Sequence, residues 1–387
     1  MCKVTVMVKD LSIRMKREVR EWNLQIITTI VFFLSMASLV IVLGLFINNH
    51  VKKFLASEEL YFPEPPASSS VCSNRSINLE DFIAPKDMLH WTSDKELFWL
   101  ASMVPRISEF PYNHTRKVAF MFLCRGRLPL APLWEMFFKG HEGLYSIYLH
   151  TSPEFSEEPP ESSVFHKRRI PSKAVQWGKA SMIDAERRLL ANALLDFSNE
   201  RFVLLSETCI PLFNFTTIYN YLIQSNLSFV GSFDDPRHIG RGRYNKRMFP
   251  TVSLSDWRKG NQWFEIHRKI AIEVVSDVKL YPVFNHHCKA PCYMDEHYLP
   301  TLVTKIYPAM NSNRSITWVD WSRGGSHPTK FLRKDVSEEF MNRIRYGFNC
   351  TYNGGLSNVC FLFARKFHPN TLEPLLRLAA TLFGFDP

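Results

Sequence analysis

A run of 24 residues without a charged side chain, from Leu24 to Ile47, constrains this chain more than any other feature. An apolar helix needs about 20 residues to cross the hydrocarbon layer of a membrane, so this run is long enough to span it. A signal peptide has a shorter apolar core and ends at a small-residue cleavage site, whereas this run leads through Asn48, Asn49 and His50 to two lysines. We therefore expect an uncleaved transmembrane signal anchor at residues 24–47.

The charges beside this run predict its orientation. Residues 1–23 carry six basic and three acidic side chains, and basic residues prefer the cytosolic side of a membrane. The tail 1–23 should therefore be cytosolic and the rest of the chain luminal. Prolines and serines cluster soon after the span, so residues 48–105 are interpreted as a luminal stem and residues 106–387 as the catalytic domain.

Six Asn-x-Ser/Thr sequons favour the same luminal location. We expect several of them, not all, to carry glycans, because a disulfide at Cys350 could block the neighbouring sequon. The candidate glycosylation sites are Asn74, Asn113, Asn214, Asn226, Asn313 and Asn349.

The net charge of +10 admits more than one kind of partner. A secretory location argues against a nucleic acid and leaves anionic substrates, phosphate groups or a solvated basic surface. Seven of the eight cysteines follow the span, so disulfides are possible and one of these thiols must stay unpaired. The spacing of His286, His287, Cys288 and Cys292 matches no standard zinc site, and a short disulfide loop or buried thiols is the better interpretation.

Short apolar runs alternate with helical patterns in the middle of the chain, as is typical of an α/β fold. Right-handed crossovers between strands buried on both faces imply a mostly parallel sheet with helices on both sides. One helix should begin with a capping box at Ser181 and Asp184, and two more are expected at 216–224 and 262–276. The predicted strands are 117–124, 144–150, 201–206 and 228–233.

Ligands of such sheets bind beyond the carboxyl ends of the strands. Ser206 and Glu207 end the third predicted strand, where either could meet a substrate hydroxyl, although Glu207 could instead pair with an arginine. The loops that we expect to line a nucleotide site are 124–127, 150–152, 206–208 and 234–237.

Several reaction classes lack support in the sequence. No Walker motif, nucleophile elbow or His-Glu-x-x-His segment is present. The Asp-x-Asp pair with which many nucleotide-sugar enzymes hold a divalent cation is also missing. Asp234 and Asp235 are followed by Pro236, which is more typical of a turn than of a metal site. No metal is expected.

Five segments in fixed order carry a resemblance to a known family. They are SETCIPL at 206–212, GRGRYNKR at 240–247, CYMDEHYL at 292–299, WVDWS at 318–322 and CFLFARKF at 360–367. Together, behind a signal anchor, they resemble the plant branch of the core-2/I-branching β-1,6-N-acetylglucosaminyltransferases, from roughly Val118 to Pro369. The resemblance implies a GT-A-like fold, a type II Golgi membrane protein and a UDP-sugar donor used without a metal.

The resemblance also implies a general base. In the family it is the glutamate of a Pro-x-Asp-Glu-like segment, which matches Glu296. An inverting transfer needs an ionised carboxylate to take the proton of the acceptor hydroxyl. Pro300 places a helix start near Glu296, where the helix dipole favours the charged form. From the residues alone, Asp295 and Glu296 capping this helix is the simpler interpretation.

A departing nucleoside diphosphate must be met by positive charge. The family uses a lysine in an Ala-x-Lys-Phe segment, which matches Lys366, and an upstream arginine, which matches Arg343 or Arg345. The residues do not decide between these two arginines. Arg365, the neighbour of Lys366, is expected to be a solvated surface charge. At the end of the second predicted strand stands His150, where the animal enzymes are expected to have an aspartate.

Two further pairs are candidates for substrate binding. Arg241 and Arg243 lie in a glycine-rich basic loop that could clamp a phosphate or an acidic acceptor, or simply be solvated. Trp318 and Trp321 could each stack on a sugar ring. Residues three apart on a strand point to opposite faces, so at most one tryptophan should reach the site.

The expected function is therefore an inverting, metal-independent glycosyltransferase of the Golgi lumen, with a UDP-sugar and a glycan or glycoprotein acceptor as substrates. N-acetylglucosamine is the favoured sugar. One alternative is a non-catalytic membrane scaffold or lectin-like protein on the same fold. Another is a transferase of this fold that uses UDP-xylose or UDP-glucuronic acid.

Overall fold

The computed structural model describes residues 22, 32–38, 44, 87–106, 114–325 and 327–385. Residues 1–75 and 76–387 form two units, and each is described by itself. In the first unit residues 32–38 are helical. Among the described residues no helix is long and apolar enough to cross a membrane, and most of the predicted span 24–47 lies outside them.

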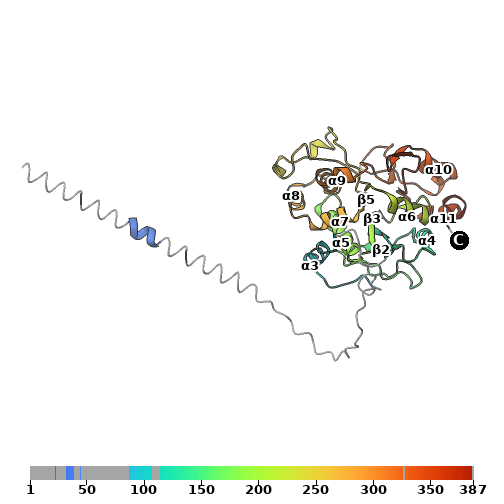
Figure 1. The fold of residues 1–387 in the computed structure, drawn as a ribbon, viewed down its shortest axis with the longest axis horizontal. Coiled ribbons are helices and arrows are strands. Elements are labelled where there is room, and N and C mark those ends of the chain that lie inside the picture. The colour runs from blue at the N-terminus through green and yellow to red at the C-terminus, as the bar shows by residue number, and fades with distance from the viewer. Residues whose placement is uncertain are drawn as a thin grey trace, which may run out of the picture. The chain divides into compact units, whose positions relative to one another are not determined.

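A four-stranded sheet in the order β2-β1-β3-β5 lies at the centre of the second unit (Figure 1). Strand β1 (Lys117–Leu123) pairs in parallel with β2 (Tyr145–His150) and with β3 (Asn199–Ser206). Strand β5 (Glu265–His267) runs antiparallel to β3. The mixed, mostly parallel sheet confirms the predicted α/β class.

Alternate side chains of β1 enter two separate hydrophobic cores, because successive residues of a strand point to opposite faces. Met121 belongs to one core and Phe120 to the other, and both are fully buried. Helices therefore cover both faces of the sheet (Figure 1). The first core contains α3 (Asp94–Ser102), α5 (Ala180–Leu195), α7 (Arg268–Ser276), α8 (Leu280–His287) and α9 (Met294–Ile306), and the second contains α4 (Ala131–Phe138), α6 (Phe215–Gln224), α10 (Glu338–Tyr346) and α11 (Leu372–Leu378).

Helix α3 lies within the range predicted as stem, 48–105. Its start is fixed by a capping box between Ser93 and Glu96. Leu97 and Ala101 are buried on the side that packs against α5 and α7. The folded unit therefore includes this part of the predicted stem.

A second sheet, in the order β4-β9-β6, brings the C-terminal part of the chain to the central sheet. Strand β9 (Phe363–Arg365) pairs antiparallel with β4 (Ile210–Pro211) and parallel with β6 (Thr317–Val319). Beyond β9, the N–H of Phe367 donates to the carbonyl of Thr208 over 3.0 Å. This bond places Lys366 beside the end of β3.

Two predicted elements of the central region were wrong. Residues 228–233 form isolated bridges instead of a parallel strand, and Phe229 pairs antiparallel with Glu265. Residues 262–276 begin as β5, and α7 starts only afterwards. The apolar spacing fits a helix, but Glu265 is held on the sheet by a buried ion pair with Arg201, with Nε to Oε1 at 2.7 Å. That partner lies too far along the chain to be seen in a local pattern.

The predicted capping box of α5 was also wrong. The helix begins after Lys179, and no side chain caps it. Ser181 accepts a hydrogen bond from the N–H of Gln176, and Asp184 accepts one from the hydroxyl of Tyr281. Both side chains therefore tie the helix to neighbouring segments.

Two disulfides lie in the described part of the chain. Cys288 and Cys292 form a short loop, which was one of the two alternatives for this pair. Cys350 and Cys360 bracket a hairpin of β7 (Cys350–Tyr352) and β8 (Gly355–Ser357). The free thiols among the described residues are buried, and burial raises the pKa of each, so they are protonated. They are Cys124 and Cys209.

Candidate active site

The carboxyl ends of three parallel strands open into one cavity of about 290 Å³, here called the strand-end cavity. The pairing register places Leu123 of β1 between His150 of β2 and Ser206 of β3. The loops after these strands therefore lie on the same edge of the sheet. Three of the four predicted loops contribute to the lining, and the fourth, 234–237, lines a neighbouring cavity.

Cationic side chains from two different sheets line the strand-end cavity. Arg125 follows β1, whereas Arg365 and Lys366 stand at the end of β9. Arg365 is buried, and its guanidinium lies 3.9 Å from the ring centre of Trp263. The expectation of a solvated Arg365 was therefore wrong. Strand β9 lies in the middle of its sheet, and this position buries side chains that local sequence makes look exposed.

Lys366 is half-buried among like charges. Burial lowers its pKa most, the charges of Arg365, Lys330 and Arg125 lower it further, and Glu207 opposes the change. No acidic side chain in the described part of the chain forms an ion pair with Lys366. Unneutralised cations at the mouth of parallel strands favour an anionic ligand such as a diphosphate.

Glu296 reaches the same cavity from the first turn of α9. Lys259 Nζ and Arg243 Nη1 both donate to its Oε2, over 2.5 Å and 2.6 Å. No described residue donates a hydrogen bond to Oε1. Burial alone would raise the pKa of Glu296, but Lys259 and then Arg243 lower it below its usual value. The carboxylate is therefore ionised at neutral pH, with one oxygen available.

The main chain of Glu296 is fixed as well. Pro300 cannot donate a hydrogen bond to the carbonyl four residues before it. The N–H of Gly260 donates to this carbonyl instead, over 2.8 Å. A Cβ on Gly260 would lie 2.8 Å from Cγ of Pro300, so the close approach requires glycine.

Glu296 also lines a second cavity, of about 830 Å³. Its walls are partly aromatic, and the guanidinium of Arg243 lies 4.5 Å from the ring centre of Tyr293. The two cavities share four lining residues, so they adjoin at the carboxylate. The shared residues are Trp177, Asn261, Glu296 and Trp321.

Comparison with known proteins shows the family to which a protein with this site belongs. Residues 118–345 match a family model described as Core-2/I-Branching enzyme, which is more than half of the chain. The chain is a member of the Core-2/I-branching enzyme family. Over 297 residues it is 37% identical to Glycosyltransferase BC10 of rice, Oryza sativa subsp. japonica, an alignment covering 65% of this chain and 73% of the rice protein. The protein is therefore a glycosyltransferase, as the resemblance implied.

In this Core-2/I-branching enzyme, Arg343 and Arg345 lie on α10 and line neither cavity. Arg343 is exposed, whereas Arg345 is buried against aromatic rings. The structure does not bring either arginine into the lining beside Lys366. The arginines that it does place there are Arg125 and Arg365.

Of the two predicted arginines in the basic loop, and likewise of the two predicted tryptophans, only one lines either of these cavities. Arg243 holds Glu296, but Arg241 pairs with Asp234 over 2.6 Å and lines neither cavity. Trp318 stacks against an interior phenylalanine, whereas Trp321 lines both cavities. One tryptophan of the pair therefore lines these two cavities, but Trp321 lies beyond the end of β6, so strand alternation does not account for the difference.

Ser206 and Glu207 both line the strand-end cavity. The hydroxyl of Ser206 lies 3.0 Å from Oγ1 of Thr208, which fixes the turn after β3. Among the described residues no group of three or more His, Cys, Asp or Glu side chains could hold a metal ion.

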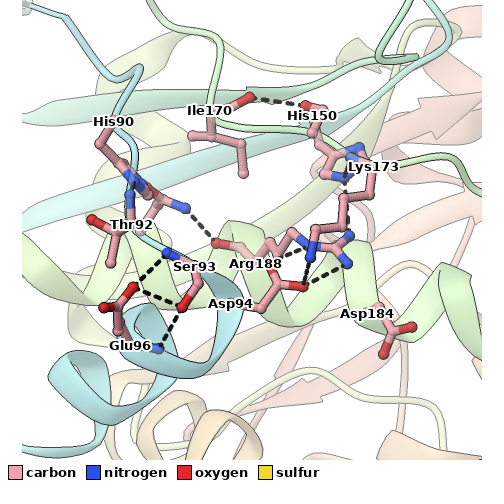
Figure 2. Close-up of polar contacts among 12 residues, drawn as sticks. His90, Thr92, Ser93, Asp94, Glu96, His150, Ile170, Lys173, Asp184 and Arg188 are labelled. Carbon is pink, nitrogen blue, oxygen red and sulfur yellow. Dashed lines mark hydrogen bonds and ion pairs between the residues drawn. The ribbon is translucent and has the colours of Figure 1, made fainter. Parts of the chain in front are cut away.

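His150 closes the strand-end cavity at the end of β2. Figure 2 shows it beside Arg188, whose Nη1 lies 3.5 Å from Nε2 of the ring. Asp94 at the start of α3 accepts from Nε and Nη2 of Arg188 over 2.8 Å and 2.9 Å, which fixes the guanidinium (Figure 2). Burial, and then Arg188, lowers the pKa of His150 to about 4, so the ring is neutral.

Four of the six sequons lie among the described residues. Asn214 caps α6, because its Oδ1 accepts from the N–H of Thr217 over 2.9 Å. Glycosylation of every sequon stays a prediction. The exposed asparagines are Asn226, Asn313 and Asn349, and those outside the described residues are Asn74 and Asn113.

Sequence reasoning missed Lys259 and did not single out Arg125. Lys259 stands 37 residues before Glu296 and belongs to no motif, so the chain offered no local signal for their ion pair. Arg125 lies in a loop that was predicted to line a nucleotide site. A basic residue in that loop was the signal that could have identified it.

Proposed function

We propose that this glycosyltransferase is an inverting enzyme that moves a sugar, with N-acetylglucosamine favoured, from a UDP-sugar to a glycan or glycoprotein acceptor without a metal ion. One observation carries the proposal. Glu296 lines both cavities, two cations hold its Oε2, and no described residue donates to its Oε1. A donor in the strand-end cavity and an acceptor in the second cavity would therefore meet at this carboxylate.

The free oxygen of Glu296 fits the proton transfer of an inverting reaction. An acceptor oxygen attacks the anomeric carbon from the face opposite the nucleotide, and its proton passes to Oε1. The bond between the anomeric carbon and the phosphate oxygen breaks as the new glycosidic bond forms. Lys259 and Arg243 keep Glu296 ionised before the step and fix its orientation.

The cations of the strand-end cavity fit the leaving group. Negative charge grows on the diphosphate as the sugar departs, and pre-positioned cations stabilise that charge. Arg125, Arg365 and Lys366 line the cavity in which it would lie. Enzymes of this family generally work without a metal, which supports assigning the charge neutralisation to side chains. The mostly parallel sheet is compatible with the GT-A-like fold that the resemblance implies.

We also propose a single-pass type II location in the Golgi membrane, with residues 24–47 as the anchor and the catalytic domain in the lumen. The charge asymmetry around the apolar run supports this orientation. The disulfides Cys288–Cys292 and Cys350–Cys360 suit an oxidising compartment. N-glycosidase should lower the apparent mass of the protein, and intact vesicles should protect its C-terminal part from protease. A protein with neither property would contradict the proposed topology.

The catalytic proposal is tested by supplying the purified full-length protein with single UDP-sugars and a panel of glycan acceptors in EDTA. Acceptor-dependent release of UDP from UDP-N-acetylglucosamine is expected, and the Glu296→Gln variant should release UDP at least about 10²-fold more slowly. If UDP were released only from UDP-xylose or UDP-glucuronic acid, that sugar would replace N-acetylglucosamine as the proposed donor sugar. No release from any donor by folded protein would favour a non-catalytic scaffold.

A further inference from the structure

Asp295 is a buried carboxyl group that the proposed reaction leaves unused. It precedes Glu296 in the first turn of α9 and lines the strand-end cavity. Its side chain is 95% buried, since the relative exposure is 5%. Oδ1 is enclosed and has no hydrogen-bond partner among the described residues. A buried polar atom without a partner is rare in folded proteins and calls for a functional explanation.

The surroundings of Asp295 do not explain the carboxyl as a structural group. Glu186 of α5 is also buried, and its Oε1 accepts from Nε2 of Gln262 over 3.0 Å. Burial, and then the charge of Glu296, raises the pKa of Asp295 to about 6. Burial also raises the pKa of Glu186, and the charge of Asp295 adds to that change. Neighbouring carboxyls therefore destabilise one another here, which a residue serving only the fold would avoid.

The charges of the strand-end cavity fall into two groups. The groups that shift the pKa of Lys366 are its cationic neighbours and Glu207. The groups that shift the pKa of Asp295 are Glu296 and that residue's partners Lys259 and Arg243. Neither of these partners lines the strand-end cavity. Cations therefore predominate around Lys366, where Glu207 is the acidic neighbour, and the part of the cavity formed by α9, here called the α9 end, presents the carboxyl groups of Asp295 and Glu296.

We propose that Asp295 binds the transferred sugar of the donor through a hydrogen bond to a ring hydroxyl, and that the donor sugar is consequently an uncharged pyranose, not a uronic acid. This inference rests on the proposed function, because a UDP-sugar with its diphosphate at Lys366 puts its sugar at the α9 end. No side chain among the described residues donates to Oδ1, so the carboxyl can meet the hydroxyl without breaking a hydrogen bond to another side chain at that atom. Gln262, which lines the cavity beside it, offers an amide to the same ring.

The carboxylate of a uronic acid would be repelled by the negative charges at the α9 end of the strand-end cavity. This carboxylate would lie with Asp295 and Glu296 in a partly enclosed cavity, where like charges repel more strongly than they do in bulk water. The nearest cations are already bound to Oε2 of Glu296. A hydroxymethyl or N-acetyl group carries no such penalty. The same residue would therefore favour one class of donor and reject another.

Calorimetric titration of the full-length protein in EDTA tests the inference, with UDP, UDP-N-acetylglucosamine, UDP-glucose and UDP-glucuronic acid as the ligands. The last two differ only at C6, so their comparison isolates the carboxylate. The wild type should bind UDP-glucose about tenfold more tightly than UDP-glucuronic acid. The Asp295→Asn variant should bind UDP with an affinity within about twofold of the wild type, but should bind UDP-N-acetylglucosamine about tenfold more weakly. Its affinities for UDP-glucose and UDP-glucuronic acid should differ less than those of the wild type.

Glu207→Gln is the matched control, because it removes a carboxylate from the cationic end of the same cavity. It should change the affinities for UDP and for UDP-sugars by the same factor. Equal losses for UDP and UDP-N-acetylglucosamine in Asp295→Asn would overturn the inference. Tighter binding of UDP-glucuronic acid than of UDP-glucose by the wild type would also overturn the inference. This comparison needs only the wild type, so it holds even if the Asp295→Asn variant does not fold. Failure of the folded wild type to bind UDP at all would overturn the proposed function as well.

Discussion

Lys259 donates to Oε2 of Glu296 over 2.5 Å, and the next residue, Gly260, donates its N–H to the carbonyl of Glu296 over 2.8 Å. Two consecutive residues thus fix both the side chain and the main chain of the proposed base. The carbonyl is available because Pro300 has no N–H to give it. Precise positioning of a general base is worth orders of magnitude in rate, so this segment should be sensitive to substitution.

Lys259→Met should shift the acidic limb of the kcat profile to higher pH. As the proposed general base, Glu296 must act in its ionised form, so activity should be lost as the pH falls through its pKa. Burial raises this pKa, and Lys259 and Arg243 lower it below the usual value. Removing one cation lets burial raise the pKa. The measurement is kcat between about pH 4 and pH 8 for both proteins.

Lys305→Met is the matched control for this profile. Lys305 pairs with Asp256 over 2.8 Å and lines neither cavity. Its removal should leave the acidic limb in place. An acidic limb that moves equally in both variants, or in neither, would contradict the role given to Lys259.

Glu296→Gln should lower kcat by about 10²- to 10⁴-fold while leaving the affinity for UDP unchanged. Glutamine preserves the size of the side chain but cannot take the proton of the acceptor. UDP release measures the first quantity and calorimetry the second. Turnover within about tenfold of the wild type would rule out Glu296 as the base.

Lys366→Ala should weaken UDP binding about tenfold or more, because a hydrogen bond between charged groups is lost. Arg343→Ala should have no effect, since Arg343 is exposed on α10 and lines neither cavity. Calorimetry with UDP distinguishes the two variants. An equal loss in Arg343→Ala would return this arginine to the phosphate site that sequence comparison allowed.

Gly260→Ala should destabilise the protein by about 1–3 kcal/mol and lower kcat. The added methyl would lie 2.8 Å from Cγ of Pro300 and from the carbonyl carbon of Gly231, and closer still to that carbonyl oxygen. Gly355→Ala is the control, because its Cβ would meet only the carbonyl oxygen of Tyr352 at 3.6 Å. Thermal unfolding compares the two. If Gly260→Ala and Gly355→Ala were equally stable, the segment around Gly260 would be able to shift and make room for the methyl group.

The central sheet was predictable because its strands are continuous apolar runs, and residues 117–123 are buried almost throughout. The end of the sheet was harder. Glu265 pairs with Arg201, 64 residues earlier, and this contact makes a strand where local spacing fits a helix. A short segment can be held in the sheet by such a tertiary contact, which no window of sequence displays.

In the site, too, residues in local motifs could be predicted, whereas contacts between distant segments could not. Glu296 and Lys366 were proposed from motifs, because each stands in a short segment that resembles the family. Arg365 was misjudged, since a charged residue beside an exposed loop gives no sign of lying on a middle strand. Lys259 has no local signal at all. What sequence could not supply is the pairing of charges between distant segments.

The most direct test is calorimetric titration of the folded full-length protein with UDP-N-acetylglucosamine in EDTA, followed by the same titration of Lys366→Ala. Saturable binding by the wild type without a divalent cation, weakened in the variant, is the predicted result. It would place a nucleotide sugar at the cations of the strand-end cavity. Absence of binding by the folded wild type, or full binding only after a divalent cation is added, would contradict a metal-independent transferase centred on Lys366 and Glu296.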